Sequence, residues 1–266
     1  MAGVKLTIMK IRIAIFSLLL MFLPLSVFSQ KAFDSGEWFK FRVHYGWFNA
    51  SYATLQVNEA KLDDKNVFHI VGKGKSTGLL HLFFKVDDNY ETYIDKKTNL
   101  PYRFIRKIDE GGYTKDLEID FDQKQNIAHV FDRKHNENST FTTRDNVHDL
   151  LSAFYYVRND LNVNKLNEGD EFNFPMFFDK ENHDFKLKFM GREVINTKFG
   201  KIATLKFRPY VLAGRVFKEK ESLTIWISDD KNKMPVKISA NLAIGSLDAD
   251  IEEFRGLKHP FKIIMN

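Results

Sequence analysis

The sequence contains no cysteine. This absence excludes structural disulfides, catalytic thiolates, cysteine-ligated metal sites and a lipid anchor on an N-terminal cysteine. A strong charge of one sign is also missing. The formal net charge is +5, and it falls to +2 without the three basic residues before position 13. So balanced a charge argues against nucleic acid as a partner.

The N-terminus carries the pattern of a secretory signal peptide. Lys5, Lys10 and Arg12 precede an almost wholly apolar run over residues 13–27, and small Ser29 follows it. We predict a cleavable signal over residues 1–29 and a mature chain over 30–266. An uncleaved anchor is the alternative, but a spanning helix needs about 20 apolar residues. The expected location is the periplasm or the outer membrane surface, with the protein soluble after cleavage.

Apolar and polar residues alternate along most of the mature chain. In residues 39–47 every odd position is apolar or aromatic, and every even position is polar or glycine. Residues 113–121, 185–189, 223–227 and 236–242 continue this period of two, with Lys115 an exception. Alternation places one face of a strand on a core and the other in water, which is typical of antiparallel sheets. Turn-rich stretches at 63–66, 110–112, 122–126 and 229–233 separate the strands.

One segment has helical spacing instead. Val147, Leu150, Leu151, Phe154 and Val157 predict a helix over about 146–159, and the residues at 145 and 146, an aspartate and an asparagine, are available as its N-cap. No linker or low-complexity tract marks a domain boundary. The expected fold is mainly β, with a large antiparallel curved sheet or half-open barrel and one principal helix. Residues 30–266 are expected to form a single β-rich envelope domain.

Three patterns that often carry chemistry are weak here. Gly74-Lys75-Ser76 ends like a phosphate-binding loop, but His69 occupies the place of the required first glycine, so a flexible loop with Gly72, Gly74 and Gly78 is expected instead of a nucleotide site. The eight histidines form no ligand grouping, and no metal or cofactor is expected. The pairs Asp87-Asp88 and Asp229-Asp230 do not converge by themselves, because adjacent strand residues point to opposite faces.

The most suggestive segment spans residues 76–85, where bulky apolar side chains follow a glycine-rich approach. It is either a lid or rim that meets an apolar ligand or a bilayer surface, or an apolar plug at one end of the sheet. The mature chain is also rich in phenylalanine, since only three of 26 lie in the signal. These rings either fill a core or line a cavity. The candidate ligand-binding residues are Trp47, Leu79, Leu80, Phe83, Phe84 and Tyr155.

Short motifs of turn and aromatic strand residues are spread over nearly all of the mature chain. They are Gly36-Glu37-Trp38, Tyr45-Gly46, residues 83–88, residues 91–95, Pro101, residues 152–158, residues 226–230 and Pro235. In them the chain resembles the domain-of-unknown-function 3108 family of exported bacterial proteins, common in Bacteroidota-type bacteria. The resemblance implies an envelope location and a β-rich fold, and it carries no catalytic residues. The half-open barrels of periplasmic lipoprotein carriers are similar in general plan, which is an analogy of fold alone.

Three functions remain open from the sequence. The leading hypothesis is an envelope protein that binds an apolar or amphiphilic, lipid-like ligand on a phenylalanine-rich concave face. The alternative is a structural or assembly partner of other envelope proteins without a small-molecule ligand. The third is a hydrolase of envelope glycans or lipids, which is least favoured because no catalytic constellation is visible. No nucleotide is expected as a partner, and the oligomeric state does not follow from the sequence.

Overall fold

The computed structural model describes residues 31–77, 85–210, 223–242 and 245–264, all within the unit Lys31–Asn266. Eight strands precede the helix: β1 (Trp38–Tyr45), β2 (Phe48–Leu62), β3 (Lys65–Ser76), β4 (Asp87–Asp95), β5 (Pro101–Glu110), β6 (Tyr113–Asp122), β7 (Ile127–Asp132) and β8 (Glu137–Thr142). The helix α3 (Leu150–Asp160) and the short 3-10 helix η1 (Val163–Lys165) follow. The last six strands are β9 (Glu171–Phe178), β10 (Glu181–Thr197), β11 (Gly200–Tyr210), β12 (Leu223–Ser228), β13 (Pro235–Asn241) and β14 (Ser246–Arg255).

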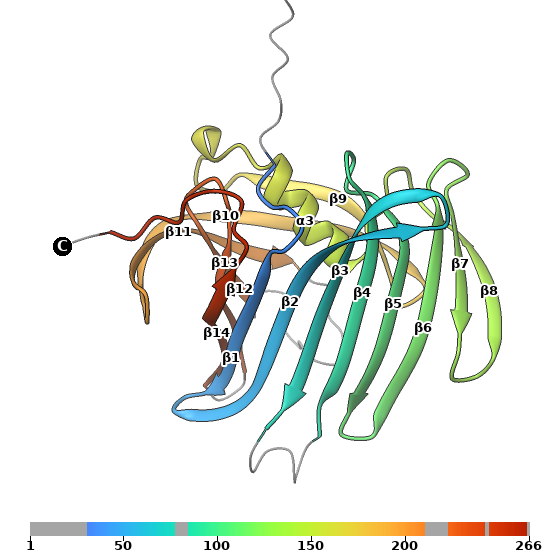
Figure 1. The fold of residues 1–266 in the computed structure, drawn as a ribbon, viewed down its shortest axis with the longest axis horizontal. Helices are drawn as coiled ribbons and strands as arrows, with labels where there is room; N and C mark the ends of the chain where they lie inside the picture. The colour runs from blue at the N-terminus through green and yellow to red at the C-terminus, as the bar shows by residue number, and fades with distance from the viewer. Residues whose placement is uncertain (1–30, 78–84, 211–222, 243–244, 265–266) are drawn as a thin grey trace, which may run out of the picture. The chain divides into compact units, whose positions relative to one another are not determined.

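All these strands form one antiparallel sheet of 14 strands (Figure 1). Its order is β8-β7-β6-β5-β4-β3-β2-β1-β14-β13-β12-β11-β10-β9, so β1 and β14 join the two halves of the chain. There Phe41 lies opposite Ile251 on one side and Ala53 on the other. The predicted large antiparallel sheet is confirmed. Within the described residues its edges, β8 and β9, are not joined by a strand ladder, so the sheet stays open.

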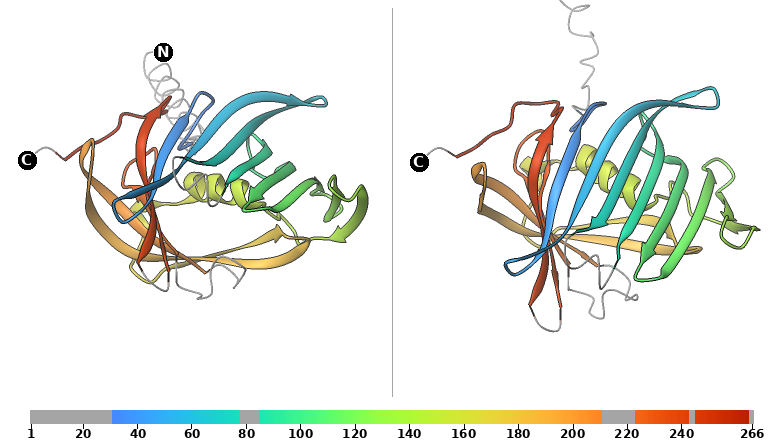
Figure 2. Two further views of the ribbon diagram at one scale, coloured as in Figure 1. Left: turned by 90° about the horizontal axis from the view of Figure 1, so that it is seen from below. Right: turned by 60° about the horizontal axis from the view of Figure 1, so that its bottom comes forward.

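The sheet curls strongly. Figure 2 shows the wall of β1–β8 facing the wall of β9–β11, with α3 lying between them. Register shifts occur at Lys40/Phe41 and Val43/His44 in β1 and at Phe189/Gly191 in β10. Such bulges bend a strand and increase its twist. We call the face of the sheet that α3 covers the inner face.

The predicted helix is confirmed, but it begins at Leu150 instead of residue 146, and the proposed cap residues were wrong. Asn146 adopts a left-handed φ of 53°, and His148 pairs with Met176 of β9, so the chain is extended before the helix. Asp149 is the cap and accepts hydrogen bonds from the N–H groups of Leu151 and Ser152. Burial raises the pKa of Asp149 to about 6, although these bonds and one from Thr92 oppose the shift.

The predicted strand faces are largely confirmed. Phe39 and Phe41 are buried while Arg42 is half-buried, and along β6 Leu117, Ile119 and Phe121 are buried. The buried apolar residues form four separate clusters and not one continuous core. Two helix residues connect three of them, because Leu151 packs on the first and second clusters and Phe154 on the second and third. The helix therefore ties the two walls together.

Candidate functional site

The predicted ligand-binding residues do not come together as one site among the described residues. Trp47 is 92% exposed in the turn between β1 and β2, where its ring meets that of Phe48 at 6.2 Å. Tyr155 is fully buried on α3, with its ring 4.5 Å from that of Phe33. Leu79, Leu80, Phe83 and Phe84 lie outside the described residues. Trp47 is therefore open to a partner, whereas Tyr155 is part of the core.

The glycines of the Gly-Lys-Ser segment were expected in a flexible loop, and this expectation is wrong for Gly72 and Gly74. Both lie within β3, where Gly74 is paired with Ala53 on one side and Asp88 on the other. Ladders on both sides hold the strand despite the weak strand propensity of glycine. Since β3 is antiparallel to both neighbours, it lacks the parallel strand on which a phosphate-binding loop is built.

Several motifs of the family resemblance converge on a buried ion pair. Arg158 of α3 donates from Nη1 and Nη2 to the two carboxylate oxygens of Glu37, each at 2.7 Å, and both side chains are buried. A third bond of 2.8 Å runs from Nη2 to the carbonyl of Asn232. The guanidinium also faces the rings of Phe33 and Phe39 at 5.4 and 5.6 Å. Only Nε of the guanidinium lacks a hydrogen-bond partner among the described residues, so this buried group holds structure and offers no open face to a ligand.

The turn between β12 and β13 completes this cluster. Lys233 donates to the carbonyl of Arg158 at 2.7 Å, and burial together with the charge of Arg158 lowers the pKa of Lys233 to about 8. Asn232 accepts from the backbone N–H of His259, and a ring nitrogen of His259 lies 2.9 Å from the carbonyl of Lys31. The cluster thus joins the start of the described chain, the helix, the turn and the C-terminal segment.

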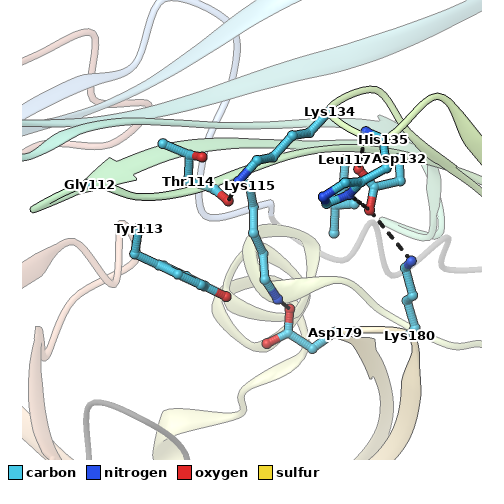
Figure 3. A pocket seen from close by; sticks show the side chains of 10 residues that line it. All are labelled: Gly112, Tyr113, Thr114, Lys115, Leu117, Asp132, Lys134, His135, Asp179 and Lys180. Atoms are coloured by element: carbon cyan, nitrogen blue, oxygen red, sulfur yellow. Dashed lines mark hydrogen bonds and ion pairs between the residues drawn. The ribbon is translucent and has the colours of Figure 1, made fainter.

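An open hollow of about 400 Å³ lies where the turn between β9 and β10 approaches the inner face of β6 (Figure 3). We call it the cationic hollow. Its lining residues are Gly112, Tyr113, Thr114, Lys115, Leu117, Asp132, Lys134, His135, Asp179 and Lys180. Three lysines and a histidine face two aspartates, so positive charge prevails. The hollow lies at the seam between the two walls, where the strand ladder is absent.

Each carboxylate of the cationic hollow is held by two basic groups. Asp179 is bound by Lys115 and by Nη1 of Arg106, the latter at 2.5 Å. Asp132 lies 3.1 Å from Nδ1 of His135 and 3.6 Å from the ammonium of Lys180. Burial alone would raise the pKa of Asp132, but hydrogen bonds from His135 and the charge of Lys180 hold it below its usual value.

Two further carboxyl groups, which lie next to each other, are found beside Arg106. Asp88 and Glu110 are close enough to hydrogen-bond, and burial together with the charge of Glu110 raises the pKa of Asp88 to about 6. The sequence pattern of adjacent aspartates did not reveal this pair, because it joins β4 to the end of β5. Asp229-Asp230, by contrast, lies in a turn as predicted, where Asp230 accepts bonds from Ser228 and Asn232.

Apolar residues form a row across the inner face, from strand to strand. Val43 pairs with Ala249, Ala249 with Ile238, Ile238 with Ile225, and Ile225 with Phe207. Direct partners share a face, and Phe207 packs in the cluster that Phe154 of α3 covers, so this face is the inner one. We call these five residues the apolar row. Phe207 is buried, whereas the other four are only half-buried.

The described residues contain no group of three or more His, Asp or Glu side chains placed to hold a metal ion. No helix in the part of the chain that the structure describes is long and apolar enough to span a bilayer.

The open, curled sheet with a helix between its walls defines a β-barrel-like fold. The structure is similar to the crystal structure of a β-barrel-like DUF1849 protein from Brucella abortus, with a TM-score of 0.55, 7% identity, and coverage of 84% of this chain and 98% of that chain. A DUF1089 family protein from Pseudomonas aeruginosa matches with a TM-score of 0.36 and 11% identity over 71% of this chain and 88% of that one. The family model of DUF3108, described as a protein of unknown function, matches residues 40–252, and the chain belongs to this family. The search of the curated proteins found no match.

Proposed function

We propose that the protein is an exported envelope protein that binds an apolar or amphiphilic ligand against the inner face of its curled sheet. The apolar row carries this proposal. Val43, Ala249, Ile238 and Ile225 face inward yet stay half-buried. Covering such apolar surface is favourable by about 25 cal/mol per Å², and an acyl chain laid across the row would cover it.

The division of the core supports the same proposal. A domain of this size usually has one contiguous core, but here there are four clusters, three of them connected through the helix and the fourth joined to the second through Leu55 of β2. Along several strands, the side chains on the inner face are buried at one position and only half-buried two residues further on. In β1 the change runs from Phe41 to Val43, and in β12 from Ile227 to Ile225. Apolar concave surfaces of this kind are the usual setting of small-molecule sites.

The test is a titration with a fluorescent fatty acid. We expect the purified protein to bind it and Ile238→Ser to weaken binding while the protein remains folded, because Ile238 is half-buried in the middle of the row. Val194→Ser is the matched control, since Val194 is 55% exposed on β10 and lies outside the row. It should leave binding unchanged.

Two results would contradict the proposal. One is an absence of fatty-acid binding by the unaltered protein. The other is equal loss of binding in the two variants. Either result would favour the alternative of an assembly partner that acts through surface contacts, for which exposed Trp47 is an available anchor.

A further inference from the structure

The end of the sheet where β1 and β14 meet carries exposed apolar side chains. Trp47, in the turn after β1, is 92% exposed, and Tyr45, Leu242 and Leu247 are between 37% and 43% exposed. Half of the large apolar side chains that are exposed in the described part of the chain therefore lie here. Tyr45 pairs with Leu247, so the turn after β1 and the turn between β13 and β14 lie at the same end of the sheet (Figure 1). We call these four residues the apolar tip.

The apolar tip is continuous with the apolar row. Tyr45 lies two residues beyond Val43 on β1, and Leu247 lies two residues before Ala249 on β14, so each shares a face with its neighbour in the row. Tyr45 is directly opposite Leu247, as Val43 is opposite Ala249. The ring of Tyr45 also lies against Gly245, where a Cβ would come within 2.8 Å of the tyrosine hydroxyl oxygen. The inner face is therefore apolar from the row to the end of these two strands.

Both turns of the apolar tip lie in stretches of sequence without charge. Residues 45–58 and 238–247 contain no Asp, Glu, Lys, Arg or His, although 28% of the chain is charged. His44, which precedes the first stretch, lies 2.7 Å from the carboxylate of Asp250 and is thus already partnered. A partner that recognises the apolar tip must therefore do so through apolar contact and not through charge.

A lipid bilayer is such a partner. Tryptophan and tyrosine gather at bilayer interfaces because each ring is apolar and carries a polar group at its edge, and leucine adds apolar area. Trp47 follows the end of β1 and Leu242 follows the end of β13, so the apolar tip is formed by the ends of hairpins. A projecting surface of this kind enters a soft bilayer directly, whereas a protein partner needs a pocket of matching shape.

We propose that the apolar tip docks on the surface of a lipid bilayer, with Trp47 at the level of the headgroups. This inference goes beyond the proposed function and does not require it, because docking needs only the apolar tip. Docking would bring the adjacent end of the apolar row to the bilayer, which is a source of amphiphiles. Since the apolar tip is uncharged, docking should occur on phosphatidylcholine, which has no net charge, and should depend little on salt.

The test is co-sedimentation of the full mature chain with phosphatidylcholine vesicles at low and at high salt. The variants are Trp47→Ser and Leu242→Ser, which should stay folded because both side chains are exposed. The matched control is Val194→Ser, which also removes an exposed apolar side chain. Val194 pairs with Ala203 near the start of β11, at the opposite end of the strands from the apolar tip. As a second measurement, brominated phosphatidylcholine should quench the fluorescence of the unaltered protein more than that of Trp47→Phe.

We expect Trp47→Ser to weaken vesicle binding about tenfold, Leu242→Ser to weaken it less, and Val194→Ser to bind as the unaltered protein does. Absence of binding to phosphatidylcholine, an equal loss in Val194→Ser, or binding that needs anionic lipid and disappears at high salt would overturn the docking. Self-association of the chain that Trp47→Ser abolishes, without vesicle binding, would show a contact between copies and overturn the bilayer as the partner. Loss of fatty-acid binding with docking retained would overturn the proposed function alone.

Discussion

Replacing Arg158 by methionine tests the reasoning about the buried cluster. Methionine keeps an unbranched apolar side chain against the surrounding rings but removes the guanidinium. Glu37 then loses both of its 2.7 Å bonds, and the carbonyl of Asn232 loses its 2.8 Å bond. Since Glu37 is fully buried, water cannot replace these partners.

The expected loss is about 4–6 kcal/mol of unfolding free energy at pH 7. Breaking a buried ion pair on one side costs about 3–5 kcal/mol, and an orphaned buried carbonyl adds about 1–3. A variant can avoid the buried charge by taking up a proton. For a carboxyl group with the ordinary pKa of about 4.3, this costs about 3.7 kcal/mol at pH 7 and about 1 kcal/mol at pH 5. The penalty should therefore fall by about 2–3 kcal/mol on acidification.

Urea unfolding followed by circular dichroism at pH 7 and pH 5 measures this penalty. Arg158→Met together with Glu37→Gln should be more stable than the single variant at pH 7 and lack its additional pH dependence. Arg192→Met is the control, because it breaks an exposed pair with Asp229 and should shift the midpoint far less. A double variant no more stable than the single one, or a penalty equal at both pH values, would refute the account.

Two further predictions concern the helix cap and the N-terminus. Because burial raises the pKa of Asp149 to about 6, the stability that this carboxyl contributes is present at low pH and is lost as pH rises through 6. From pH 7 to pH 5 the free energy of unfolding of the unaltered protein should therefore rise by about 1.4 kcal/mol relative to that of Asp149→Asn, in which the neighbouring His148 titrates equally. If the difference in unfolding free energy between the two proteins were the same at both pH values, Asp149 would not be desolvated. We also expect the secreted protein to begin at Gln30 or within a few residues of it, and N-terminal sequencing that returned Met1 or Met9 would exclude cleavage.

The strands were predictable because their signal is local. Alternation fixes which side chains of β1 and β6 are buried, and turn residues mark where strands end. The helix start was not predictable from spacing alone. Val147 fits the helical pattern, but the extended segment that contains it is fixed by its pairing with β9, far along the chain. The same tertiary effect places Gly72 and Gly74 in a strand.

The cationic hollow was missed because no short segment contains it. Lys115, Lys134 and Lys180 come from three separate parts of the chain, and only the curling of the sheet brings Lys180 to β6. One signal for the buried cluster did exist. Arg158 is spaced three, four and seven residues from Tyr155, Phe154 and Leu151, so it falls on the apolar stripe of the predicted helix. An arginine there requires a buried carboxylate partner.

The motifs that identified the family lie mostly in the structural part of the molecule. Glu37, Arg158 and the turn containing Asp230 meet in the buried cluster that joins both ends of the chain to the helix. None of the residues that line the cationic hollow belongs to those motifs. In this chain, the motifs therefore mark the contacts that hold the sheet around α3. A change at Arg158 is therefore expected to destabilise the fold, because it breaks a buried ion pair, whereas a change at exposed Lys134 is not.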